Sequence, residues 1–396
     1  MPGKQPFSSR TQWDLDEINL TEDDSPEYLY DLTVSNPTAC GFDYGGLDLP
    51  ALFGGCDLLR YEPEPFGLRA AREAVASHVG DEAIPSADNI MLTASTSDAY
   101  HYLFRMLCDP GDEILAPAPS YPLFGLLAEV NDCRLVPYPL VHDGGLWRID
   151  QDALLRAVGP KTRAILIVNP NNPTGSYLRE DDLAFLDALA QRHNLSLICD
   201  EVFSDYPHLP GADAVRSVVG RTGALTFILG GLSKSLALPQ LKLAWTLMQC
   251  ADARLLRQAR RRLEVIADIF LSVATPVQQV LPALLERQAA IQPQIRQRIA
   301  TNLSYLEKQL ADARLPLPTR VEGGWYAVVP LPPDIRETRL TETLAEDTRT
   351  RIHPGYFYDF SSPHAVLSLL TPPDVWRAGL EHFVRAVRKV SAAELS

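Results

Sequence analysis

Short apolar runs alternate with longer stretches of helical periodicity between about residues 88 and 248. The runs are rich in Val, Ile and Leu and are bounded by polar residues or glycine, which is typical of buried strands. They lie at 89–93, 113–117, 134–140, 164–169, 195–201, 225–231 and 243–248. Alternating strands and helices are typical of βαβ units, so the pattern predicts a mostly parallel seven-stranded sheet flanked by helices.

The pattern changes after this region. Residues 251–310 are rich in Arg, Gln and Leu and predict long helices, and the chain beyond about residue 311 returns to mixed strand and helix behind proline-rich breaks. We therefore expect an α/β fold with a large domain at 46–285 and a smaller α+β domain at 286–396. Residues 1–45 are expected to form an N-terminal arm and part of the small domain.

The charge and the cysteine content limit which partners and which cellular compartment we expect for the protein. The 396 residues carry 36 Lys and Arg against 50 Asp and Glu, and the formal net charge of −14 disfavours nucleic acid and anionic membranes as partners.

The six cysteines lack CxxC spacing, so we predict no metal site and no disulfide framework. The first residues also lack the apolar run of a signal peptide, and no run suggests a membrane span. We expect a cytoplasmic protein.

Polar residues follow several of the predicted strands, at the edge where an open parallel sheet binds ligands. The spacing of 28 residues between Asn172 and Asp200, and of 34 residues between Asp200 and Lys234, corresponds to about one strand–helix–strand unit each. These three side chains should therefore meet at one sheet edge. The full set consists of Ser95, Thr96 and Ser97 at a predicted helix start, Asn172 in the turn NPNNPTG, Asp200 with Glu201, and Ser233 with Lys234.

These residue types together suit one cofactor, pyridoxal 5′-phosphate. Its aldehyde requires a lysine amine, and Lys234 is one of six lysines in the chain. The free N–H groups and the dipole of a helix start favour a phosphate near Ser95. Taken singly, each signal is ordinary, because Asp200 and the serines are also typical helix caps. The order and spacing of these residues along the chain favour a single site that all of them share.

The chain resembles the class I and II pyridoxal-phosphate aminotransferases of fold type I over nearly its whole length. NPNNPTG (169–175) is similar to the family's signature turn, DEVF (200–203) to its D-E-x-Tyr, and GLSKSLALPQLKLAW (231–245) to its S-x-S-K segment. Further similar segments are YEPEPFGLRAAREAVA (61–76), EGGWY (322–326) and HPGYFYDF (353–360).

The resemblance implies an aminotransferase that moves an amino group between an amino acid or amine and a keto acid in a ping-pong cycle. It implies Lys234 as the Schiff-base lysine and proton shuttle, Asp200 as the partner of the pyridinium nitrogen, and Asn172 as the partner of the phenolic oxygen. Tyr121 would stack on the cofactor ring. It also implies a homodimer with shared active sites, in which Tyr61 reaches the partner's cofactor. The other cofactor-binding candidates are Ser95, Thr96, Ser97, Phe203, Ser233 and Lys242.

The sequence departs from the family at four of these positions. Phe203 replaces a tyrosine whose hydroxyl bonds the phenolic oxygen, and Gly231 replaces a phosphate-binding serine. Lys242 replaces an arginine, so a bidentate contact with the phosphate becomes a point charge. Val366 stands where the family places the arginine that binds the substrate carboxylate, and valine cannot form that salt bridge.

The substrate is therefore expected either to lack that carboxylate or to be bound by other groups. Ser35, Asn172 and Arg10 are the substrate-binding candidates, and His353 is a further candidate anion binder. A surface role for Arg10 and a structural role for His353 are the alternatives.

The missing arginine also leaves a second class of reaction open, namely a pyridoxal-phosphate lyase, decarboxylase or oxidase on the same scaffold. A DNA-binding regulator is disfavoured because no basic winged-helix module precedes residue 30 and the net charge is −14. A dinucleotide-binding enzyme is disfavoured because no GxGxxG follows the first strand.

Overall fold

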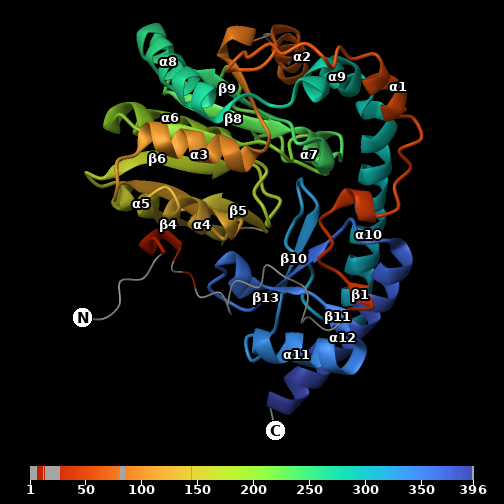
Figure 1. Cartoon of the computed structure of the whole chain (residues 1–396). Helices are drawn as coiled ribbons and strands as arrows, with labels where there is room; N and C mark the ends of the chain where they lie inside the picture. Colours follow the sequence, from red (N-terminus) through yellow and green to blue (C-terminus); the bar gives the residue numbers. More distant parts are fainter. Residues whose placement is uncertain (1–6, 12, 14–26, 81–84, 144, 395–396) are drawn as a thin grey trace.

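An eight-stranded sheet lies at the centre of the computed structural model, which describes residues 7–11, 13, 27–80, 85–143 and 145–394 (Figure 1). The strands from β8 to β4 pair in parallel, and β9 and β5 run antiparallel to their neighbours. The predicted α/β fold with a mostly parallel sheet is confirmed. Across the sheet the strands are β2 (Ile90–Thr93), β9 (Ala244–Gln249), β8 (Thr226–Gly231), β7 (Ser196–Asp200), β6 (Thr162–Val168), β3 (Glu113–Ala118), β4 (Arg134–Asp143) and β5 (Leu146–Ile149).

The sheet has one strand more than the sequence pattern predicts. All seven predicted runs form strands, and the additional strand, β5, pairs with the end of β4 as an antiparallel hairpin in which Asp143 lies opposite Leu146. β5 has only four residues, LWRI, at the edge of the sheet. So short a strand offers too few positions for its alternation to be recognised.

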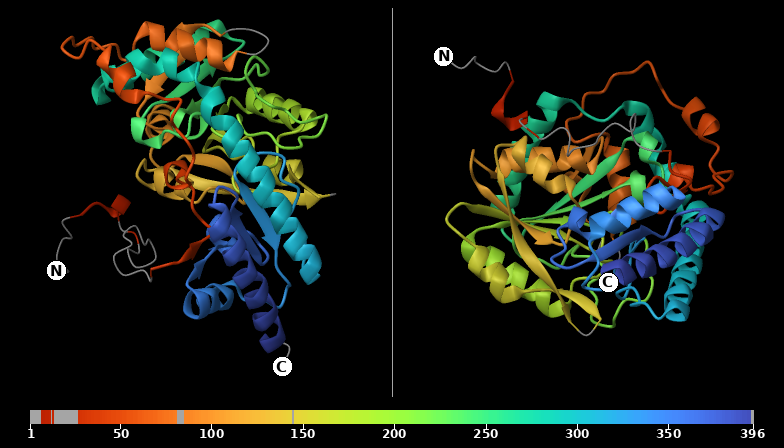
Figure 2. Two further views of the ribbon diagram at one scale, coloured as in Figure 1. Left: turned by 90° about the vertical axis from the view of Figure 1, so that its right-hand side faces the viewer. Right: turned by 90° about the horizontal axis from the view of Figure 1, so that it is seen from below.

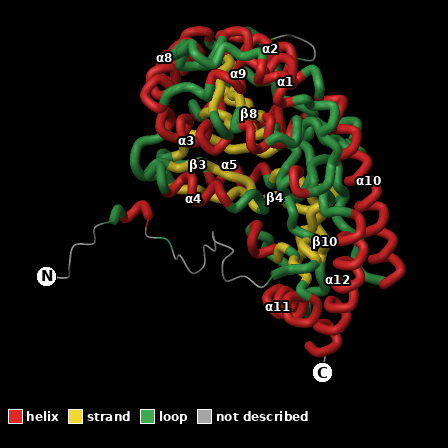
Figure 3. Tube along the Cα trace, turned by 45° about the vertical axis from the view of Figure 1, so that its right-hand side comes forward, coloured by secondary structure: helices red, strands yellow, loops and turns green. Residues whose placement is uncertain are grey.

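Helices cover both faces of the sheet, because successive strand residues point to opposite sides (Figure 3). Leu166 and Phe227 belong to the apolar cluster that contains residues of α3 and α8, whereas Ile165 and Ile228 belong to the cluster that contains residues of α2 and α6. The helices of this larger part are α1 (Leu49–Gly54), α2 (Arg69–Val79), α3 (Thr96–Leu107), α4 (Leu123–Glu129), α5 (Gln151–Ala157), α6 (Glu180–His193), α7 (Leu232–Ser235), α8 (Ala253–Phe270) and α9 (Thr275–Leu285).

A smaller sheet lies below the large one in the view of Figure 1. Its antiparallel strands, in order, are β10 (Tyr326–Pro330), β13 (His364–Ser368) and β12 (His353–Pro354). The helices α11 (Glu337–Thr348) and α12 (Pro373–Glu394) pack against each other beside it. β1 (Tyr30–Asp31) pairs in parallel with β11 (Thr350–Arg351), which joins a segment near the start of the chain to this C-terminal part.

The long helix α10 (Gln288–Ala313) connects the two parts along one side of the molecule (Figure 2). Its 26 residues correspond to a length of about 39 Å. The expected domain boundaries after residues 45 and 285 stay predictions. None of the helices in the described ranges combines the length and apolar character needed to cross a membrane.

Candidate active site

A cavity of about 160 Å³ opens at the carboxyl ends of β6, β7 and β8. Within the described ranges, the charged residues that line it are Asp200 and Lys234. It brings together most of the residues that the sequence predicts, namely Ser35, Thr96, Ser97, Tyr121, Asn172, Asp200, Phe203, Ser233 and Lys234.

Asp200 is the last residue of β7, and its carboxylate is buried. Oδ1 accepts a hydrogen bond from the Val202 backbone N–H at 3.0 Å, and Oδ2 accepts one from the Tyr100 hydroxyl at 2.7 Å. Burial raises the pKa of Asp200, whereas both hydrogen bonds and the charge of Lys234 act to lower it. The carboxylate is therefore oriented by two donors before any ligand is bound.

Lys234 lies in α7, the short helix that follows β8. Its Nζ lies 4.8 Å from the centre of the Trp325 ring and 5.6 Å from the centre of the Phe203 ring. Loss of hydration lowers the pKa of Lys234 to about 8, although the charge of Asp200 opposes this shift. More of this amine is neutral near pH 7 than in an ordinary lysine, and the neutral amine is the nucleophilic form.

The start of α3 faces the cavity. Ser95 is the N-cap, and its Oγ accepts a hydrogen bond from the Asp98 backbone N–H at 3.1 Å. Thr96 and Ser97 are the first two helical residues and line the cavity, whereas Ser95 does not. Because the first N–H groups of a helix have no partner within it, this end of the cavity suits an anion.

Asn172 presents a side-chain amide at the cavity wall. Its Oδ1 is buried and has no hydrogen-bond partner among the described residues. The surrounding turn is fixed by its neighbours, because Asn169 Oδ1 accepts from the Leu178 backbone N–H at 2.9 Å and Asn171 Oδ1 accepts from the Thr174 hydroxyl at 2.8 Å. A buried acceptor without a partner is costly, so the position of Oδ1 favours a hydrogen-bond donor at this wall.

These observations fit pyridoxal 5′-phosphate. The Lys234 amine suits the aldehyde, the buried Asp200 carboxylate suits the ring nitrogen, and the start of α3 suits the phosphate. The NH₂ group of the Asn172 side chain, not its unpaired Oδ1, is the donor that the phenolic oxygen requires. Phe203 is buried against Trp325, with ring centres 5.3 Å apart, and contributes no hydrogen-bond donor at the cavity wall.

Some residues of the cavity are not identified by sequence analysis. Tyr326 lines it and lies in the quoted segment EGGWY, yet the resemblance assigns it no role. Tyr326 and Ser35 both line the cavity, and burial raises the pKa of Tyr326 to about 12, so this hydroxyl stays neutral. Phe124 also lines the cavity, and Tyr100 lies outside the lining but contacts Asp200. Both are buried residues of helices, α4 and α3, where a lone aromatic residue indicates only core packing.

Val366 is fully buried in β13, where its backbone lies opposite Val328 and His353 of the neighbouring strands. It does not belong to the residues that line the cavity. His353 does not supply the missing charge, because its Nδ1 lies 2.9 Å from the Tyr358 hydroxyl and burial lowers its pKa to about 4. The imidazole is therefore neutral near pH 7, which favours the structural role of His353 over that of an anion binder.

Arg10 is also not brought to the cavity. Its Nε donates a hydrogen bond to Asp132 Oδ1 at 2.5 Å on the surface of the protein. Asp132 lies just before β4, at the edge of the sheet where the parallel strands begin, whereas the cavity lies where they end. Asp132 thus pairs with the Arg10 guanidinium away from the cavity, and Arg10 does not line the cavity of its own chain. Its role in substrate binding stays a prediction.

Two further candidates lie outside the cavity lining, namely Lys242 and Tyr61. Lys242 is exposed and has a left-handed backbone with a φ of 50°. The Tyr61 side chain is 72% exposed. Their assignment to the cofactor phosphate stays a prediction.

The departure at Gly231 has a steric reason. A Cβ atom at this position would lie 3.0 Å from the Cβ and 3.1 Å from the Cα of Ala244 on the neighbouring strand β9. A serine therefore does not fit here unless the two strands move apart.

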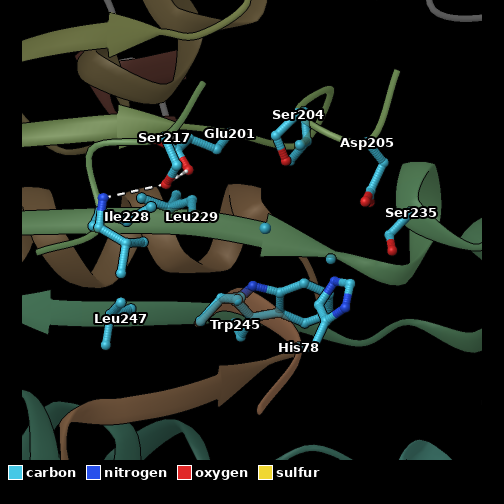
Figure 4. A pocket seen from close by; sticks show the side chains of 15 residues that line it. His78, Glu201, Ser204, Asp205, Ser217, Ile228, Leu229, Ser235, Trp245 and Leu247 are labelled. Atoms are coloured by element: carbon cyan, nitrogen blue, oxygen red, sulfur yellow. Dashed lines mark hydrogen bonds between the residues drawn. The ribbon is translucent and has the colours of Figure 1, made fainter. Parts of the chain in front are cut away.

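Glu201 points away from this cavity and into a second one of about 120 Å³ on the other face of the sheet (Figure 4). Its carboxylate accepts hydrogen bonds from the Ser217 hydroxyl at 2.7 Å and the Val218 backbone N–H at 2.8 Å. Burial raises the pKa of Glu201 to about 7. Successive residues of a strand point to opposite sides, so Asp200 faces the candidate active site, whereas Glu201 binds Ser217 and Val218 in the loop before β8.

Comparison with known sequences identifies relatives of this chain. Nicotianamine aminotransferase B of Hordeum vulgare is 35% identical over 234 residues, which cover 57% of this chain and 41% of that protein. Glutamate-pyruvate aminotransferase AlaA of Escherichia coli (strain K12) is 27% identical over 282 residues, which cover 68% of this chain and 66% of that protein. The chain spans less than half of the length of the nicotianamine aminotransferases that it matches.

Solved structures and family models agree on the fold. A crystal structure of an aminotransferase from Escherichia coli has a TM-score of 0.84 at 22% identity, covering 98% of this chain and 99% of that chain. The sequence model of the family described as aminotransferase class I and II matches residues 57–369, which is most of the chain. This protein therefore belongs to the class I and II aminotransferase family.

Proposed function

We propose that this protein is a pyridoxal 5′-phosphate-dependent aminotransferase that moves an amino group between an amino acid or amine and a keto acid. The observation that carries the proposal is the convergence of Lys234, Asp200, Asn172 and the start of α3 on one cavity. The family membership supports it, and so do the relatives, which are themselves aminotransferases. They favour this activity over the alternative of a lyase, decarboxylase or oxidase.

When bound, the cofactor supplies a carbonyl carbon that accepts the amine and a ring that withdraws electrons from the substrate's α-carbon. Lys234 would hold the cofactor through its Nζ, and the same amine would carry a proton to or from the substrate. Asp200 stabilises a proton on the ring nitrogen, and the Asn172 amide binds the phenolic oxygen. Thr96, Ser97 and Ser233 bind the phosphate.

The groups that this chain offers to the part of the substrate beyond its amine are neutral. The described residues offer the hydroxyls of Ser35 and Tyr326 at the cavity wall, and the two charged residues there are assigned to the cofactor. Tyr121 lines the same cavity and is partly exposed, so its ring would cover one face of the cofactor ring.

The protein acts as a homodimer with shared sites in this proposal. Tyr61 is exposed next to Leu58 and Leu59, which are 62% and 99% exposed, so this segment presents apolar surface that a second copy would cover. The six cysteines are free thiols, which suits the reducing cytoplasm.

Single-turnover chemistry tests the proposal. The cofactor-loaded protein should be mixed with a panel of amino acids and amines without any keto acid, and the products should be separated by chromatography. We expect at least one donor to yield one equivalent of pyridoxamine phosphate per site and then to stop, and we expect no product from Lys234→Ala. Continued turnover of a donor without an acceptor would contradict an aminotransferase and support the alternative.

A further inference from the structure

Tyr100 does not line the candidate active site but contacts it through Asp200. Its side chain is buried, and its hydroxyl donates the 2.7 Å hydrogen bond to Asp200 Oδ2. The ring is held between aromatic neighbours, at 5.2 Å from Phe124 and 5.9 Å from Phe104 between ring centres. A buried tyrosine packed in this way has little freedom to turn its hydroxyl elsewhere.

The position of Tyr100 in α3 relates it to the other end of the site. It lies four residues after Thr96, on the same side of the helix and about 6 Å further along the axis. Thr96 lines the cavity at the start of the helix, where the helix suits an anion. One turn further along the same helix, the Tyr100 hydroxyl donates a hydrogen bond to the Asp200 carboxylate.

We propose that Tyr100 is a positioning residue that fixes the Asp200 carboxylate for the ring nitrogen of the cofactor and withdraws part of its negative charge. This inference rests on the proposed function, because it requires that pyridoxal 5′-phosphate occupies the cavity. The Val202 N–H fixes Oδ1 and the Tyr100 hydroxyl fixes Oδ2. Each oxygen keeps one further acceptor position, so the oriented carboxylate can still receive the ring N–H.

The charge effect has a definite sign. Without the hydrogen bond from Tyr100, more negative charge stays on Asp200 beside the ring, or the carboxyl takes up the ring proton. In both cases the proton on the nitrogen that links Lys234 to the cofactor is repelled less, so its pKa rises. The titratable groups close to Asp200 are Tyr100, Tyr121, Cys199, Glu201 and Lys234.

The test compares Tyr100→Phe with Tyr138→Phe. Tyr138 is equally buried, and its hydroxyl donates to the Leu166 carbonyl oxygen at 2.9 Å, so both variants lose one buried hydroxyl but only the first touches Asp200. Two quantities are measured on each full-length protein. They are the dissociation constant of pyridoxal 5′-phosphate, from quenching of tryptophan fluorescence, and the pH midpoint of the absorption change of the bound cofactor.

We expect Tyr100→Phe to weaken cofactor binding by about tenfold, as for loss of a hydrogen bond to a charged group, and to raise the pH midpoint. Tyr138→Phe should leave both quantities unchanged. Incorporation of 3-fluorotyrosine at position 100 gives a stronger donor, so it should lower the midpoint, and it serves as the test if Tyr100→Phe does not fold.

Equal dissociation constants and equal midpoints in wild type and Tyr100→Phe would overturn the inference while leaving the proposed function intact. A midpoint that moves upward in the fluorotyrosine protein would also overturn it. If the wild-type protein does not bind pyridoxal 5′-phosphate at all, both the inference and the proposed function are wrong.

Discussion

The amine of Lys234 sits in an environment that keeps much of it neutral. Its Nζ lies over the faces of Trp325 and Phe203, while Asp200 is the acidic residue whose charge acts on it. Loss of hydration outweighs that charge, and the pKa falls to about 8. Capture of an aldehyde by this residue should therefore depend on pH in a range where ordinary lysines remain protonated.

The rate at which the cofactor-free protein captures pyridoxal 5′-phosphate should rise with pH and reach half of its maximum near pH 8. The sign follows from the neutral amine being the nucleophile, whose fraction grows as pH passes the pKa. Stopped-flow absorbance over a pH series checks this, with Lys234→Ala as the control that shows no covalent phase. A rate that keeps rising until about pH 10, as for an unperturbed lysine, would contradict the lowered pKa.

Residues at strand ends could be predicted from sequence, and residues that act through side-chain direction could not. Lys234, Asp200 and Asn172 follow strands at spacings that one sheet edge imposes, and the cavity brings them together. Tyr100 reaches Asp200 only because α3 packs on that face of the sheet. Periodicity identifies the apolar face of a helix but does not tell which strand end a hydroxyl on that face will meet.

At the scale of elements, the end of β8, just before α7, packs closely against the neighbouring strand β9. Gly230 and Gly231 end β8, and a Cβ at Gly230 would lie 2.5 Å from the Trp245 indole nitrogen. The strand pair β8 and β9 is therefore packed too tightly for side chains at these two positions. The two-residue strand β11, in contrast, pairs with β1 near the start of the chain, and β5 has only four residues in a local hairpin with β4, so local patterns identify neither strand.

Gly231→Ser should lower the free energy of unfolding by about 1–3 kcal/mol, the usual cost of forcing atoms into a packed core. The new Cβ would press on Ala244, whose backbone cannot yield without moving β9. Urea unfolding measures the change. Gly54→Ser is the matched control, because a Cβ there meets no atom within 4 Å, and its stability should stay unchanged. Unchanged stability of Gly231→Ser, with tighter cofactor binding, would show that the serine fits after all.

At the scale of the whole molecule, a buried ion pair joins the larger part to the segment that enters the smaller sheet. Arg179 Nη2 lies 2.6 Å from Glu322 Oε2, and both side chains are almost completely buried. Glu322 also accepts hydrogen bonds from the backbone N–H groups of Gly211 and Tyr177, at 3.0 Å and 3.3 Å. This pair holds the segment EGGWY, and with it Tyr326, against the cavity.

Glu322→Gln should destabilise the protein by about 3 kcal/mol, because it leaves the Arg179 charge buried with weaker compensation. The control is Glu180→Gln, which removes the exposed ion pair with Arg221 and should cost less than about 1 kcal/mol. Both values come from urea unfolding monitored by fluorescence. Equal costs for the two variants would mean that the buried pair does not connect the two parts.

Leu59→Asp should convert a dimer into monomers if the exposed segment around Tyr61 forms the interface. A charge placed at the centre of an apolar contact loses its hydration without a partner, which weakens association. Sedimentation velocity gives the readout, and Leu209→Asp, at a leucine that is 74% exposed elsewhere, should leave the dimer intact. A wild-type protein that sediments as a monomer would refute the shared sites.

The most direct measurement of the central claim locates the covalent bond between cofactor and protein. The protein is incubated with pyridoxal 5′-phosphate, reduced with borohydride, digested and mapped by mass spectrometry. We predict one modified residue, Lys234, with no modification at Lys242. Stoichiometric modification at another lysine, or none at all, would contradict the account of this site.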